Sequence, residues 1–79
     1  MAGSNSVTVR LGGSLAEIAG CALCEVALDE GVTLAEIAAR VGISPNLVML
    51  YSVSGRLRPA NHAPEPGDEV LLIPAVAGG

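Results

Sequence analysis

The sequence predicts a single α+β domain over residues 1–79, with one main helix packed on one face of a mixed sheet of four to five strands. The chain has 79 residues, a length that suits one small hydrophobic core. Its apolar share is 51% although it contains a single aromatic residue, so the core must be built from Val, Leu, Ile and Ala. Several short segments alternate between apolar and polar residues, whereas one longer segment has helical periodicity.

The first strand is predicted over residues 7–11, where Val7, Val9 and Leu11 share one face. Gly12 and Gly13 break this strand, and neither a P-loop lysine nor dinucleotide-binding glycine spacing follows them. Ser14 and Glu17 have the spacing of a capping box, which predicts a short helix over residues 14–19.

A second strand is predicted over residues 23–28, with Leu23, Val26 and Leu28 available for burial. Cys21 precedes this strand and Cys24 lies within it. Four interpretations of the pair compete: a redox pair, half of a zinc site, a disulfide, or two buried thiols. The redox interpretation requires the pair to lie at a helix N-terminus that follows a strand, whereas this pair lies at the start of a predicted strand. A zinc site requires four ligands, and the pair supplies only two of them. Two buried structural thiols are therefore favoured.

The main helix is predicted over residues 34–41. Thr33 and Glu36 form a capping box, and apolar residues recur at the helical spacing i, i+3, i+4 and i+7. Gly42 follows as the residue expected to end the helix in the left-handed conformation.

The second half of the chain predicts strands at residues 47–53 and 69–73, with a short strand or extended arm at residues 56–59 between them. These strands hold more large apolar residues than one helix can cover. We therefore expect an apolar, partner-binding patch on the opposite sheet face, to which Leu71 and Leu72 are assigned.

Composition excludes several classes of function. The net charge is −4 with no lysine in the chain, and one aromatic residue provides no stacking platform, so nucleic acid is not an expected partner. No apolar run approaches the length needed to span a membrane, and residues 1–6 lack the features of a secretion signal. We expect a cytoplasmic protein.

No constellation of residues typical of an enzyme is found, and no metal site is expected. His62 is the only histidine and lies in a proline-bordered loop. The adjacent carboxylates Asp29 and Glu30, like Asp68 and Glu69, flank turns and are interpreted as solvated turn residues.

The last strand is followed by Pro74, Ala75, Val76, Ala77, Gly78 and Gly79. Residues 75–79 are expected to form a flexible C-terminal tail, because small residues bring little surface to bury. Glycine lacks a side chain and enters slots too narrow for other residues.

Residues 67–79, Gly-Asp-Glu-Val-Leu-Leu-Ile-Pro-Ala-Val-Ala-Gly-Gly, resemble the C-terminal signature of the small sulfur-carrier proteins of the MoaD/ThiS family. Residues 29–37, which lead into the main helix, occupy the place along the chain that the corresponding segment has in this family. The resemblance implies a ubiquitin-like β-grasp fold and a sulfur-carrier function.

In this family the terminal glycine is adenylated by an ATP-dependent activating enzyme and becomes a thiocarboxylate. If this chemistry applies to the present sequence, Gly79 would bear the sulfur. The residues that would thread into partners are Pro74, Ala75, Val76, Ala77 and Gly78. The chain would bind no cofactor itself, whereas its activating adenylyltransferase would use ATP and magnesium.

The other implied partners are a sulfurtransferase or persulfide donor and an acceptor enzyme such as a molybdopterin synthase large subunit. The short helix at residues 14–19 favours similarity to the molybdopterin synthase small subunit. A carrier dedicated to thiamine, cysteine or a sulfur-containing natural product stays open, as does a ubiquitin-like modifier or interaction module.

Overall fold

The computed structural model describes residues 5–29 and 31–74; Glu30 and the tail residues 75–79 lie outside the described residues. The elements along the chain are β1 (Ser6–Leu11), α1 (Ser14–Ala19), β2 (Leu23–Ala27), α2 (Leu34–Arg40), the 3₁₀ turn η1 (Pro45–Leu47), β3 (Val48–Val53), β4 (Arg56–Arg58) and β5 (Glu69–Pro74).

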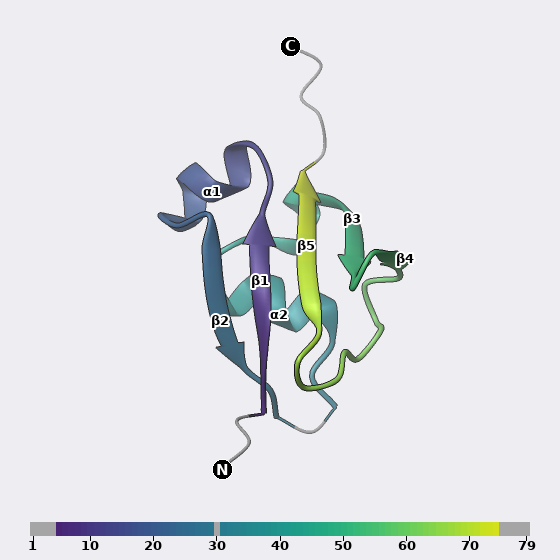
Figure 1. Cartoon of the computed structure of the whole chain (residues 1–79). Coiled ribbons are helices and arrows are strands. Elements are labelled where there is room, and N and C mark those ends of the chain that lie inside the picture. Colours follow the sequence, from purple (N-terminus) through teal and green to yellow (C-terminus); the bar gives the residue numbers. More distant parts are fainter. Residues whose placement is uncertain (1–4, 30, 75–79) are drawn as a thin grey trace.

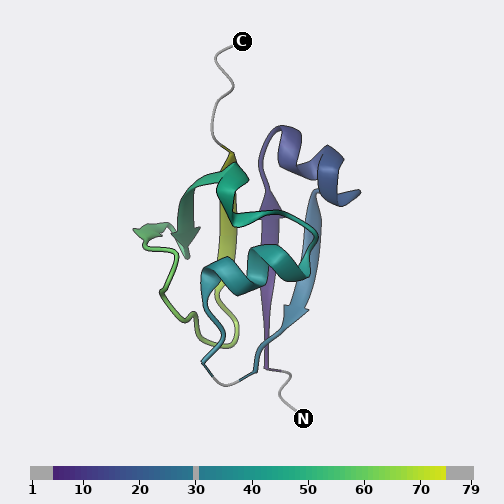
Figure 2. The same ribbon diagram turned by 180° about the vertical axis from the view of Figure 1, so that it is seen from behind.

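The five strands form one mixed sheet in the order β2-β1-β5-β3-β4. β5 lies at its centre, parallel to β1 and antiparallel to β3, and the edge strands β2 and β4 pair antiparallel with β1 and β3 (Figure 1). Figure 2 shows α2 crossing the other side of this sheet. The predicted layer of one main helix on a mixed sheet is confirmed, and the segment after residue 55 is a strand.

The core lies between the sheet and α2. Register places Val9 beside Val70 and Leu11 beside Leu72, so these side chains point to the same face. The core is aliphatic except for Tyr51, as the composition predicts. Its buried members are Val7, Val9, Leu11, Leu15, Val26, Val32, Leu34, Ile37, Ala38, Ile43, Val48, Tyr51, Val53, Val70 and Leu72.

The capping box of α2 is confirmed. The backbone N–H of Glu36 donates to the Thr33 hydroxyl at 3.3 Å, and the Glu36 carboxylate accepts the Thr33 N–H at 2.9 Å. These bonds satisfy donors that have no partner inside the helix. Gly42 has a φ of 89°, the left-handed conformation that the sequence predicts after the helix.

The predicted capping box of α1 is wrong. Gly13 occupies the cap position and no side chain caps this helix. Instead, the N–H groups of Leu15 and Ala16 donate to the carbonyls of Gly12 and Gly13 at 3.0 and 3.3 Å. Ser14 is already the first helical residue, so its hydroxyl stands one position too late to cap.

Two strands differ from their predicted form. In β2, Cys24 pairs with Val9 and faces the core, so its neighbour Leu23 points outward and is 56% exposed. The strand predicted from residue 47 begins one residue later, because Pro45 starts a 3₁₀ turn whose Asn46 N–H is accepted by Ser44 Oγ. An irregularity between Val48 and Leu50 then turns Leu50 outward.

The long loop between β4 and β5 is fixed at both ends. Near its start, the N–H groups of Ala35 and Leu34 donate to the carbonyls of Ala60 and His62 at 3.0 and 2.9 Å. Near its end, the Gly67 N–H donates to the Ser6 carbonyl at 2.8 Å. Hydrogen bonds to α2 and to β1 therefore order this loop.

Among the described residues, neither helix is long and apolar enough to cross a bilayer.

Candidate functional site

The central strand β5 carries the predicted site residues toward one pole of the molecule. β1 runs parallel to β5, so the two strands end on the same side of the molecule. Because α1 follows β1 in the chain, β5 ends beside α1 (Figure 1). Pro74 is the last residue of β5. The predicted sulfur-bearing Gly79 and the threading residues Ala75, Val76, Ala77 and Gly78 follow it directly in the sequence and lie outside the described residues.

A pair of glycines packs against the end of β5. The Gly12 N–H donates to the Leu72 carbonyl at 3.0 Å. A Cβ on Gly12 would stand 3.2 Å from that carbonyl oxygen and 3.4 Å from Pro74 Cδ, and one on Gly13 would stand 3.3 Å from Pro74 Cγ. The sequence predicts only that these glycines end the first strand, since nothing in the local pattern indicates a contact with residues as distant as Leu72 and Pro74. They hold the last residues of β5 in place.

Leu71 and Leu72 lie on opposite sides of the sheet. Leu72 is completely buried and pairs with Leu11 and Tyr51 in the core. The prediction that Leu72 belongs to the partner-binding face is therefore wrong, because successive side chains of a strand alternate between faces and Leu72 shares the face of Val70. Leu71 is half-buried on the outer face, away from α2.

Four apolar side chains gather on the outer face near the end of β5, and we call them the outer patch: Leu50, Leu57, Leu71 and Ile73. Leu50 pairs with Ile73, while Ser52 stands between Leu71 and Leu57 in the cross-strand register. Leu50 and Leu57 are 42% and 62% exposed. The apolar runs of β3 and β5 predict an apolar face here, whereas the contribution of Leu57 from β4 is not predicted.

Beyond the outer patch, the outer face carries polar pairs together with the exposed Leu23 of β2. The Arg10 Nε atom lies 2.8 Å from a Glu69 carboxylate oxygen, and Ser6 Oγ donates to Glu25 at 3.0 Å. The four residues of the outer patch thus form the apolar part of the face that lies nearest to Pro74 on β5, β3 and β4.

The two cysteines form a disulfide, with Cα atoms 6.7 Å apart. The favoured interpretation as two buried thiols is wrong, and the disulfide that the sequence left open is present. Cys24 faces the helix side of β2 and Cys21 lies in the turn before it, and both are half-buried against the core. Their side chains meet because the chain reverses direction between α1 and β2.

Three of the four carboxylates predicted to lie in turns, Asp29, Asp68 and Glu69, have partners within the protein, and Glu30 lies outside the described residues. Asp29 forms an ion pair with Arg40 at 2.8 Å. Asp68 accepts hydrogen bonds from the Glu65 N–H at 2.8 Å and from Ser54 Oγ at 3.2 Å. Among residues 5–29 and 31–74, no three His, Cys, Asp or Glu side chains gather in a way that could hold a metal ion.

The structure combines a five-stranded mixed sheet, one main helix, an apolar outer patch and a central last strand that ends at Pro74. The same fold is found in solved structures. SAMP1 of Haloferax volcanii is 28% identical, with a TM-score of 0.71, 94% of this chain and 99% of that chain covered. A molybdopterin converting factor, subunit 1, of Pyrococcus furiosus is 20% identical, with a TM-score of 0.72 and coverage of 92% and 100%. The predicted ubiquitin-like β-grasp fold is confirmed.

The ThiS family model matches residues 9–79. The chain belongs to the ThiS family, within the class of small ubiquitin-like sulfur carriers and modifiers. No curated protein is significantly similar to it in sequence.

Proposed function

We propose that the chain is a sulfur carrier whose reactive group is the carboxylate of Gly79. The observation that carries this proposal is the match to the ThiS family through residue 79, which includes the Gly78-Gly79 pair. In this role the chain is a protein co-substrate and not an enzyme. The exchange occurs in the cytoplasm, where the activating enzyme has ATP and magnesium.

The proposed chemistry has two steps. The Gly79 carboxylate attacks the α-phosphate of ATP in the activating enzyme, which releases pyrophosphate and leaves an acyl adenylate. A persulfide from the sulfur donor then displaces AMP, and a thiol reductant cleaves the resulting acyl disulfide to leave the thiocarboxylate. A carboxylate is a poor electrophile, and adenylation supplies the leaving group that it lacks.

We propose the outer patch as the surface on which the activating enzyme docks. Its four apolar residues lie at the end of the sheet where Pro74 leads to the tail, so one partner can hold the patch and receive the tail together. The net charge of −4 favours basic surfaces on that partner and increases the association rate more than the final affinity. The proposed acceptor is an enzyme such as a molybdopterin synthase large subunit; a role as a dedicated carrier for thiamine, cysteine or a sulfur-containing natural product is the alternative.

The test is mass spectrometry of the protein after incubation with ATP, magnesium, the activating enzyme, a persulfide donor and a thiol reductant. We expect one oxygen of the Gly79 carboxylate to be replaced by sulfur. Gly79→Ala should strongly impair the exchange, because a methyl group must enter a slot that admits only hydrogen. Ala77→Gly is the matched control, since it also changes one methyl group of the tail, and it should keep the reaction.

Deletion of Gly78 and Gly79 should abolish sulfur transfer without lowering the melting temperature. Sulfur found on Cys21 or Cys24, with the Gly79 carboxylate unchanged, would show that the site assignment is wrong.

A protein modifier is the second candidate, favoured by the 28% identity to SAMP1, a name that stands for small archaeal modifier protein 1. A modifier transfers its activated glycine to a lysine side chain, whereas a sulfur carrier transfers sulfur to a small acceptor. Isopeptide-linked peptides that end in Gly78-Gly79, recovered after incubation with the activating enzyme and cell extract, would identify the modifier. Their absence together with thiocarboxylate formation would identify the carrier.

A further inference from the structure

Two of the four arginine side chains have no ionic partner in the part of the chain that the structure describes. Arg10 pairs with Glu69 and Arg40 with Asp29, each at 2.8 Å. Arg56 and Arg58 make no ion pair and no side-chain hydrogen bond with any residue in 5–29 or 31–74. A chain with a net charge of −4 thus keeps two adjacent cations available on β4.

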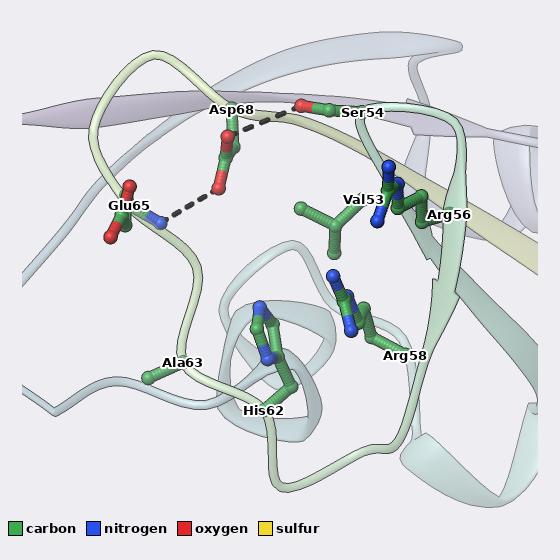
Figure 3. Close-up of a pocket in the computed structure, with 8 residues that line it drawn as sticks. All are labelled: Val53, Ser54, Arg56, Arg58, His62, Ala63, Glu65 and Asp68. Atoms are coloured by element: carbon green, nitrogen blue, oxygen red, sulfur yellow. Dashed lines mark hydrogen bonds between the residues drawn. The ribbon is translucent and has the colours of Figure 1, made fainter.

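These two arginines share one side of a hollow. Arg56 pairs with Val53 and Arg58 with Tyr51, so both side chains leave β4 on the side that carries the core. The hollow between β4 and the following loop has a volume of about 340 Å³. Figure 3 shows Arg56 and Arg58 on one side of it, Asp68 and Glu65 on the other, and His62 on the loop that connects the two sides.

The walls of the hollow are held by hydrogen bonds within the protein. The carbonyl of His62 accepts the Leu34 N–H at 2.9 Å, which fixes the loop beside α2. Both carboxylate oxygens of Asp68 accept hydrogen bonds, one from Ser54 Oγ and one from the Glu65 N–H (Figure 3). A site formed in advance in this way loses little conformational entropy when a ligand enters.

The charges of the two walls define the chemistry of a ligand. Guanidinium groups donate in a planar fork that suits phosphate and carboxylate oxygens. Side chains two residues apart on a strand start about 7 Å from each other, so two forks can converge on the three terminal oxygens of one phosphate, whereas a carboxylate saturates one fork. Asp68 and Glu65 on the facing wall accept hydrogen bonds and suit hydroxyl groups.

We propose that this hollow binds a small phosphate monoester that also carries hydroxyl groups. Arg56 and Arg58 hold the phosphate, His62 is the third group beside it, and Asp68 and Glu65 accept from the hydroxyl groups. The volume lies at the lower end of the range for small-molecule sites, about 300–1,000 Å³, and exceeds what a bare phosphate ion needs.

The site is separate from the tail. Asp68 precedes β5 and Pro74 ends it, and a six-residue strand spans about 20 Å. The inference therefore does not depend on the sulfur-carrier proposal, and its test needs no activating enzyme.

The experiment is a titration of the isotopically labelled full chain, followed by amide chemical shifts, with glycerol 3-phosphate, inorganic phosphate and glycerol at constant ionic strength. We expect glycerol 3-phosphate to give saturable shifts confined to residues 54–68. Its affinity should exceed that of inorganic phosphate at least fivefold, and glycerol alone should cause no shifts.

The Arg56→Gln/Arg58→Gln double variant should bind glycerol 3-phosphate at least tenfold more weakly. Both side chains are exposed, so the amide spectrum should show an intact fold. Arg10→Gln is the matched control that removes a guanidinium from the outer face, and it should bind as the wild type does.

Three results would overturn the proposal. The first is the absence of saturable shifts, and the second is equal loss of binding in Arg10→Gln and in the double variant. The third is equal affinity for inorganic phosphate and glycerol 3-phosphate. A triglutamate peptide is included in the titration: if it saturates the same amides and glycerol 3-phosphate does not, the site instead receives an acidic protein segment.

Discussion

The neighbouring residues Leu71 and Leu72 allow the two faces of β5 to be tested with chemically identical substitutions. Leu72 is completely buried in the central strand, so Leu72→Ala removes buried methyl groups and leaves a cavity. Such a change costs about 3–4 kcal/mol of unfolding free energy. Leu71 is half-buried on the outer face, and Leu71→Ala should cost about 1 kcal/mol.

These costs are large for a chain of 79 residues, whose total unfolding free energy is about 4–12 kcal/mol. At about 4–8 °C per kcal/mol, Leu72→Ala should lower the melting temperature by about 12–32 °C and Leu71→Ala by about 4–8 °C. Urea titration of both variants, followed by circular dichroism, gives the two free energies directly.

Leu71→Asp extends the comparison from stability to function. It places a charge in the outer patch, where docking of the activating enzyme would bury a carboxylate without a partner. We expect a folded protein that binds the activating enzyme at least tenfold more weakly in titration calorimetry. Equal destabilisation by the two alanine variants would refute the assignment of faces, and normal binding of Leu71→Asp would refute the outer patch as the docking surface.

Two further predictions concern Tyr51 and Gly12. Burial raises the pKa of the Tyr51 phenol above its ordinary value of 10.0, and its hydroxyl has no hydrogen-bond partner among residues 5–29 and 31–74. The unfolded chain therefore ionises first, so stability is complete below pH 10 and falls as the pH rises further, by up to about 1.4 kcal/mol per unit. Tyr51→Phe should remove this dependence in urea titrations without a loss of stability at pH 7; an unchanged decline would point to another group. Gly12→Ala should cost about 1–3 kcal/mol, since its Cβ meets the Leu72 carbonyl oxygen, a backbone atom that cannot rotate away, and an unaltered urea midpoint would contradict this packing.

The sequence alone determined the features that depend on neighbouring residues. Two such features are the capping box of Thr33 and Glu36 and the glycine that follows α2. Their interactions join residues a few positions apart, so the sequence pattern predicts them without knowledge of the tertiary structure. The β-grasp arrangement could be predicted because the strand patterns and the resemblance of residues 67–79 point to the same fold. The capping box predicted at Ser14 is wrong although the spacing fits, because the carbonyls of Gly12 and Gly13 accept the N–H groups at the start of α1.

Tertiary structure alone decided which side of each strand faces the core and which distant residues meet. An uninterrupted apolar run such as residues 70–73 contains no alternation from which its inner face could be read, and pairing with β1 and β3 puts Leu72 inside. Gly12 packs against Pro74, and Arg56 lines the same hollow as His62 and Asp68, only once the whole chain has folded. These contacts join segments whose local sequences carry no signal of each other, because the free energy that brings them together comes from burial of the shared core.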